Sequence, residues 1–163
     1  MVRALLLLLL TTGLAGLPAL AAAEEEAPFG RAEAEEIDYS GQKVVFDVAV
    51  DSVDRMNAVL DRAGFLSRIN GEDPFETSVV IVLHGSEIPF FAVENFEKHE
   101  ELVRRAQDLT LNGVIEFRMC REAASFHDYE PDDIHGFVTM VPMAEAEIVR
   151  LQQEEDHAYL QYR

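Results

Sequence analysis

Short β-branched runs alternate with amphipathic helical segments along most of this sequence, and this alternation constrains the fold more than any other feature. From Lys43 onward four runs are almost wholly apolar, which is typical of strands covered on both faces of a sheet. The predicted strands are residues 44–50, 78–83, 114–119 and 137–141, with a short fifth at residues 158–162. The alternation predicts an α/β fold: a mainly parallel sheet of four to five strands with helices on both faces, in three layers.

Helices are predicted between the strands from the helical spacing of apolar side chains. The first follows an N-cap at Asp51 or Ser52, the second spans residues 94–111, and the last begins at Pro142. Residues 121–129 are expected to be a short helix or irregular. The inward positions of the three long helices are Met56, Val59, Leu60, Ala63 and Leu66; Phe96, Leu102, Val103 and Ala106; and Ala144, Ile148 and Leu151.

The N-terminal residues have the three parts of a secretory signal peptide: a basic tip at Arg3, a leucine-rich run, and small residues up to Ala23. We therefore expect residues 1–23 to be cleaved and the mature protein to be exported, in a bacterium to the periplasm. An uncleaved membrane anchor is the alternative, because the apolar stretch is about long enough to span a bilayer. Pro18 and the alanines after it favour cleavage.

Residues 24–42 are acidic and poor in large apolar side chains, which predicts a flexible leader before a single domain at residues 43–163. The whole chain has a formal charge of −18, and losing Arg3 with the signal peptide makes it −19. So acidic a protein repels nucleic acid and anionic lipid surfaces. We therefore expect neither a nucleic-acid partner nor a membrane partner for the mature protein.

The chain has one cysteine, so an exported form has no internal disulfide and its core alone must hold it together. The thiol of Cys120 is then buried and inert, paired between chains, or reactive. In an open α/β sheet, ligands bind beyond the carboxyl ends of the strands. The predicted strands place His84 and Cys120 at that edge, together with Asp51 and Pro142.

Three features favour a thiolate at Cys120. It is expected at the start of a helical segment, where free amide N–H groups stabilise negative charge. Arg118 and Arg121 flank it, and a neighbouring strand end brings His84 close. Against this, a lone cysteine is more often a small buried hydrophobe.

Other interpretations of these residues stay open. A His-Gly pair after a buried strand is often only a turn, so His84 has a structural interpretation too. A metal site formed by His84, Cys120, His127 and His135 is a further alternative, although the spacing matches no tight zinc pattern. The adjacent Phe90 and Phe91 suit a pocket or an interface, but more commonly pack in the core. So short a domain has little room for a Cys-His protease cleft.

Four features follow one another along residues 43–162. They are a strand ending in His84-Gly85, a strand running from Asn112-Gly113 to Cys120, the Val141-Pro142 pair followed by residues 146–152, and the terminal Ala158-Tyr159-Leu160. This ordered set resembles the DsrE/DsrF-like family. Many members have Gly after the cysteine, where this chain has Arg121, which predicts a different loop over the cysteine.

The resemblance implies a compact α/β domain that assembles into homo- or hetero-oligomers, often trimers or hexamers. We expect no cofactor. The resemblance also implies a sulfur-relay role for Cys120, which would receive sulfur as a persulfide from a donor protein and pass it to an acceptor. His84 would lie nearby, and Arg118 and Arg121 would stabilise the charge of the persulfide. The alternative is a non-catalytic oligomeric binding module of the same fold with a buried Cys120.

Overall fold

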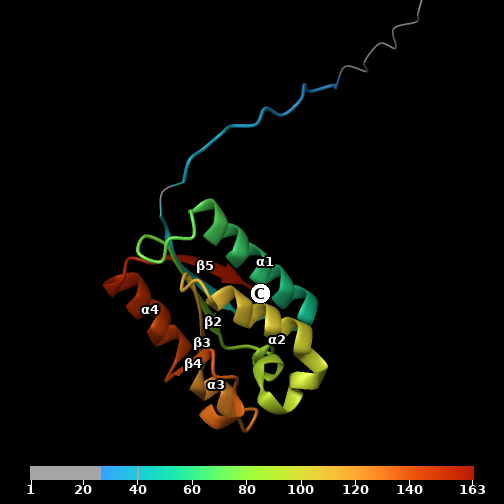
Figure 1. The fold of residues 1–163 in the computed structure, drawn as a ribbon, viewed down its shortest axis with the longest axis vertical. Coiled ribbons are helices and arrows are strands. Elements are labelled where there is room, and N and C mark those ends of the chain that lie inside the picture. The colour runs from blue at the N-terminus through green and yellow to red at the C-terminus, as the bar shows by residue number, and fades with distance from the viewer. Residues whose placement is uncertain (1–26, 40) are drawn as a thin grey trace, which may run out of the picture. The chain divides into compact units, whose positions relative to one another are not determined.

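The computed structural model describes residues 27–39 and 41–163, and its domain is built on one five-stranded parallel sheet in the order β4-β3-β2-β1-β5 (Figure 1). The predicted α/β class and parallel sheet are therefore confirmed. The strands are β1 Lys43–Val48, β2 Ser78–Leu83, β3 Ile115–Cys120, β4 Val138–Val141 and β5 Ala158–Tyr162. The helices are α1 Val53–Ile69, α2 Phe96–Thr110, α3 Arg121–Ser125 and α4 Ala144–Glu154, with 3₁₀ turns at Ile88–Phe91, Val93–Asn95 and Pro131–Asp133.

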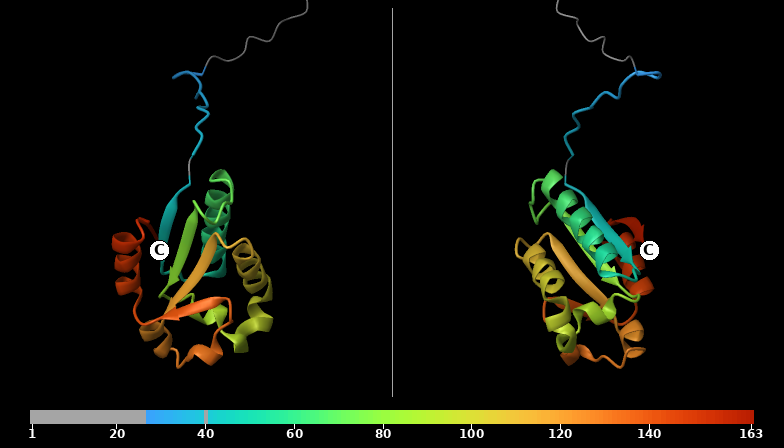
Figure 2. Two further views of the ribbon diagram at one scale, coloured as in Figure 1. Left: turned by 60° about the vertical axis from the view of Figure 1, so that its left-hand side comes forward. Right: turned by 90° about the vertical axis from the view of Figure 1, so that its right-hand side faces the viewer.

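The helices cover both faces of the sheet because the direction of winding changes once. From β1 to β4 each new strand is added on the same side, and the crossovers place α1 and α2 on one face. The chain then returns from β4 to the far side of β1. A right-handed crossover in that opposite direction puts its helix on the opposite face. Figure 2 shows the result, with α4 on one side of the sheet and α1 and α2 on the other.

Alternation along the strands divides the interior into two layers. The larger layer lies under α1 and α2 and contains Phe46, Ile81, Phe91 and Phe117, all at most 1 % exposed. Phe91 is therefore a core residue, with Phe90 packed against the same layer, as the commoner interpretation of that pair predicted. The smaller layer lies under α4. Its members are Val45, Val80, Val82, Cys120, Ala144, Ile148 and Leu151.

Several predicted boundaries are corrected by the structure. The third strand is Ile115–Cys120, one residue later at each end than the predicted 114–119, and Cys120 is its last residue. The second long helix begins at Phe96, because 3₁₀ turns occupy residues 88–91 and 93–95. The last helix begins at Ala144, with Met143 as its N-cap, and Pro142 lies outside it. Ser52, and not Asp51, caps α1, accepting a hydrogen bond from the Arg55 N–H at 3.4 Å.

Residues 27–36 form a separate unit that contains no helix or regular strand. The predicted signal peptide lies outside the described residues, as do positions 24–26 and 40 of the predicted leader. Within the described part of the chain, no helix is both long enough and apolar enough to cross a bilayer.

Candidate functional site

Cys120 is the last residue of β3 and lies at the carboxyl edge of the sheet, on the face covered by α4. Its Sγ caps α3 by accepting a hydrogen bond from the Ala123 N–H at 3.4 Å. The residue is only 4 % exposed and packs with the apolar side chains under α4. The sulfur is thus at the edge where α/β sheets bind ligands, with an N–H donor directed at it, but covered.

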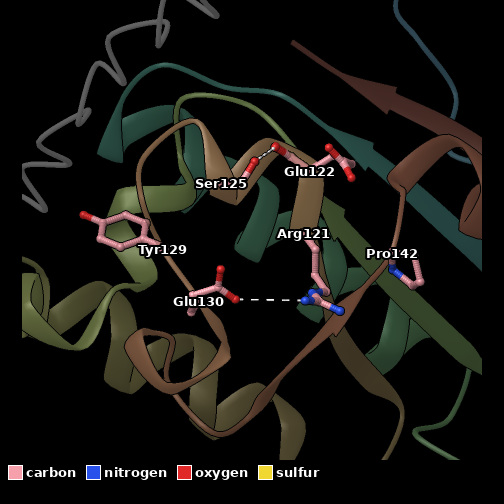
Figure 3. Close-up of a pocket in the computed structure, with 6 residues that line it drawn as sticks. All are labelled: Arg121, Glu122, Ser125, Tyr129, Glu130 and Pro142. Atoms are coloured by element: carbon pink, nitrogen blue, oxygen red, sulfur yellow. Dashed lines mark hydrogen bonds and ion pairs between the residues drawn. The ribbon is translucent and has the colours of Figure 1, made fainter.

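A pocket of about 230 Å³ opens beside this edge (Figure 3). Arg121, the residue after Cys120, and Pro142, the residue after the β4 partner of Cys120, both line it. The Arg121 guanidinium lies 4.0 Å from the Glu130 carboxylate across the pocket, and its side chain is 54 % exposed. Arg121 therefore offers a solvated positive charge next to the cysteine.

Arg118 is not available in the same way. Its guanidinium pairs with Glu147 of α4 and with Glu116, at 2.9 Å from the latter, and its side chain is largely buried. Two carboxylates thus neutralise it, and among the described residues the Cys120 sulfur has a hydrogen bond only from Ala123. We assign Arg118 to the attachment of α4 to the sheet.

His84 follows β2 directly and lies on the same face of the sheet as Cys120. The register pairs Leu83 with Met119, so the next positions along the two strands are His84 and Cys120. Its backbone N–H donates to Glu87, and its Nε2 bonds the carboxylate of Asp47 on β1. His84 is therefore both a turn residue and half of an Asp-His pair.

Asp47 is the centre of a polar cluster that the sequence did not reveal. It is 5 % exposed, and its carboxylate accepts hydrogen bonds from His84, Tyr159, Gln161 and Arg163. Burial alone would raise the pKa of Asp47, but the hydrogen bonds, of which that from Arg163 is the strongest influence, hold this pKa well below its usual range. Asp47 is therefore an ionised acceptor at neutral pH.

A second buried carboxylate shapes the turn that carries His84. Glu87 is fully buried and accepts backbone N–H donors from Val50 at 2.8 Å, His84 at 2.9 Å and Gly85 at 2.8 Å. Burial raises its pKa, although the backbone donors oppose that change. Glu87 thus joins the ends of β1 and β2 and fixes the backbone at His84.

Sequence reasoning missed Asp47, Glu87, Tyr159, Gln161 and Arg163. One signal was present for Asp47, which is the only charged side chain in the apolar run of residues 44–50. A carboxylate at such a position is rarely left unpaired. Its partners on β5 could not be read locally, because they lie more than 110 residues further along the chain.

The alternative metal site gains no support from the geometry. His127 is exposed and stacks on Tyr129, whereas the His135 ring packs between Phe96 and Phe137. The part of the chain that the structure describes contains no group of three or more His, Cys, Asp or Glu side chains placed to hold a metal ion.

The chain thus belongs, by its topology, to the class of parallel α/β proteins with helices on both faces. A protein of unknown function from Methanobacterium thermoautotrophicum, MTH1491, has a similar structure. The match has a TM-score of 0.56 and 19 % sequence identity, and covers 74 % of this chain and 98 % of that one. No family model matches the sequence, and no curated protein matches it significantly. The comparison shows the fold alone.

Proposed function

We propose that this protein is an exported sulfur carrier of the DsrE/DsrF-like type that holds sulfur as a persulfide on Cys120. The observation that carries the proposal is the position of the Cys120 sulfur. It lies at the carboxyl edge of the sheet and accepts the Ala123 N–H, which is the contact that an anionic sulfur requires. The ordered sequence resemblance from Lys43 to Tyr162 supplies the second line of support.

The proposed chemistry is exchange at sulfur. The Cys120 thiolate attacks the outer sulfur of a donor persulfide, one S–S bond breaks as another forms, and the donor leaves as a thiolate. An acceptor thiolate then removes the outer sulfur from Cys120 in the same way, so that no net oxidation occurs. The exposed guanidinium of Arg121, directly after Cys120, is placed to attract the anionic donor.

Transfer requires the sulfur to become accessible, since Cys120 is 4 % exposed. The segment that follows it is the shortest α-helix of the described chain, the five residues of α3, and Phe126 just after it is 86 % exposed. Exposed segments with few buried contacts open at low free-energy cost. We propose that the exposed residues 125–128 move aside during transfer, while Cys120 stays on β3 and keeps the Ala123 N–H. Donor and acceptor proteins, a trimeric or hexameric assembly and a periplasmic location belong to the same proposal.

The test is intact mass spectrometry of the reduced mature protein after incubation with glutathione persulfide. The expected result is a gain of one sulfur atom that dithiothreitol removes and that the Cys120→Ser variant lacks. An unchanged mass in the wild type, with a thiol that iodoacetamide labels only after unfolding, contradicts the proposal.

The burial of Cys120 favours a second candidate: a non-catalytic oligomeric binding module of the same fold. In that case the cysteine serves only as part of the apolar layer under α4. Cys120→Ala would then leave partner binding and assembly unchanged in analytical ultracentrifugation. The mass experiment separates the two candidates, because only the carrier gains a reductant-sensitive sulfur.

A further inference from the structure

We propose that Asp47 and His84 form a dyad that takes the proton from Cys120, so that the carboxyl ends of β1, β2 and β3 carry an Asp-His-Cys relay. The inference rests on the proposed sulfur-carrier function and deepens it. It assigns a proton acceptor, His84, and a positioning residue, Asp47, to the thiol of Cys120.

The order of the strands brings the three residues together. β1, β2 and β3 are adjacent and in parallel register, with Asp47 opposite Val82 and Leu83 opposite Met119. Side chains alternate along each strand, so Asp47, His84 and Cys120 all face the α4 side of the sheet. Neighbouring strands lie about 4.8 Å apart, which places positions 84 and 120 side by side at the edge of the sheet. The His84 ring is turned toward Asp47, and among the described residues it makes no direct hydrogen bond to the Cys120 sulfur.

The hydrogen bonds of His84 define which ring nitrogen is available. The ionised carboxylate of Asp47 can only accept, so Nε2 of His84 carries the proton in their hydrogen bond. In the neutral ring Nδ1 is then an acceptor, and among residues 27–39 and 41–163 it has no hydrogen-bond partner. Asp47 thus fixes both the tautomer and the orientation of the ring, as the carboxylate of a catalytic triad does.

The surroundings of the dyad indicate that Asp47 acts mainly by orienting the His84 ring, and less by stabilising a positive charge on it. Arg163 and Tyr159 also donate to Asp47, and the guanidinium of Arg163 compensates its charge. His84 itself retains 18 % side-chain exposure, which leaves its outer edge open at the carboxyl end of the sheet. The ring can therefore exchange protons with solvent or with a bound thiol.

In the proposed step, Nδ1 of His84 accepts the proton of the Cys120 S–H through one bridging water, which gives a thiolate and an imidazolium. The thiolate attacks the outer sulfur of a small persulfide, R–S–SH. The S–S bond of the donor breaks, a new S–S bond forms on Cys120, and R–S⁻ leaves. The leaving thiolate takes the proton from His84, so protons and electrons balance without an added oxidant.

The deciding experiment is the pH dependence of Cys120 alkylation by iodoacetamide in the native, reduced mature protein. We expect His84→Gln to slow alkylation about tenfold near pH 6.5 and to leave it almost unchanged above about pH 9, where an ordinary thiol does not need a base. His127→Gln is the matched control, because it removes an exposed histidine close in sequence to Cys120. Asp47→Asn should shift the profile in the same direction by a smaller factor.

The shape of the profile separates chemistry from structure. If His84→Gln changes only how often residues 125–128 open, it alters the rate by the same factor at every pH, and that result would overturn the relay. An unchanged profile in His84→Gln would overturn it as well. Melting curves exclude unfolded variants, and Asp47→Glu, which keeps the acceptor, should recover part of the rate at low pH.

The mass experiment with glutathione persulfide keeps the two proposals distinguishable. If the wild type gains sulfur but the alkylation profile does not depend on His84, the carrier function stands and the relay is overturned. If the wild type gains no sulfur but the alkylation profile depends on His84, the carrier function is overturned and Cys120 is still a thiol activated by His84.

Discussion

Gly85 lies in the turn that carries His84, and the surrounding atoms leave no room for a side chain at this position. A Cβ at this position would lie 2.6 Å from the Ala49 Cα, 2.8 Å from the Ala49 Cβ and 2.8 Å from a carboxylate oxygen of Glu87. Two of these contacts are with the chain after β1, which cannot yield without moving the strand. The Glu87 contact would also disturb the acceptor of three backbone N–H groups.

We predict that Gly85→Ala lowers the free energy of unfolding by about 2 kcal/mol, the usual cost of overpacking a tight site. Urea denaturation followed by circular dichroism measures the change. Gly136→Ala is the matched control, because a Cβ there meets nothing within 4 Å and the backbone has no positive φ. Equal effects of the two substitutions would contradict the argument from close approach.

The candidate site could be predicted from single residues only in part. Cys120 and His84 were found because each stands at the end of an apolar run, and strand ends meet at one edge of a parallel sheet. Arg118 was interpreted from its proximity in sequence to Cys120, but alternation does not determine the partner of a long side chain. In the structure, Arg118 forms an ion pair with Glu147 of α4. The partners of Asp47 depend on the pairing of β1 with β5, which no local pattern encodes.

At the scale of elements, the sequence predicted best where apolar runs have sharp ends. Strands β2 and β5 have the predicted bounds, since polar or turn residues flank both. Proline and acidic residues predicted the first residues of helices less reliably. Pro142 was expected to begin a helix, yet α4 begins at Ala144 after the extended N-cap Met143. The start of α2 was displaced because a 3₁₀ turn at residues 93–95 directly precedes it, as is frequent at the ends of α-helices.

Strand β5 is an edge strand that pairs only with β1 and has mostly exposed side chains. The backbone ladder with β1 and the packing of Tyr162 on Phe46 hold it, and the polar cluster around Asp47 adds side-chain contacts. Tyr159 and Gln161 of β5 and the adjoining Arg163 all donate to that one carboxylate. The same contacts fix the orientation of His84, so the edge strand and the candidate site depend on each other.

We predict that Tyr159→Phe destabilises the protein by about 1 kcal/mol, the typical net value of one hydrogen bond. The effect should be local: backbone amide hydrogen exchange should accelerate in β5 more than in β2, which is central and buried. Hydrogen-exchange mass spectrometry measures both strands in one experiment. Tyr39→Phe, in the exposed segment before the domain, is the control, since no described hydrogen bond involves its hydroxyl. Uniform acceleration in every strand would contradict a local role.

At the scale of the whole molecule, histidines with lowered pKa values make stability depend on pH. His157 is 4 % exposed, lies between Ser78 and the carbonyl of Leu151, and has a pKa lowered chiefly by burial. Burial lowers the pKa of His99 and His135 as well. These rings stay neutral in the folded chain at a pH where the unfolded chain has already bound a proton.

The sign of the effect follows from proton uptake. Below the unfolded histidine pKa of about 6.5 the unfolded state binds more protons, so the free energy of unfolding falls as pH decreases toward the lowered folded pKa values. Carboxylates with a lowered pKa, such as Asp47 and Glu147, reduce the free energy of unfolding only at lower pH, where the unfolded state binds their protons first. Glu87, whose pKa burial raises, binds its proton first in the folded state, so it increases the free energy of unfolding as the pH decreases. A comparison between variants at the same pH cancels its contribution.

We therefore predict that the free energy of unfolding decreases from pH 7.5 to pH 5.5, and that His157→Gln reduces this slope while lowering stability at pH 7.5. Urea titrations at each pH measure both quantities. Ser78→Ala separates the two causes, because it removes the 3.1 Å hydrogen bond to His157 but keeps the buried ring. It should lower stability and retain the slope. If His157→Gln kept the wild-type slope, the pH dependence would have to originate in His99 and His135, whose packing against Phe90, Phe96 and Phe137 would then dominate the acid response of the fold.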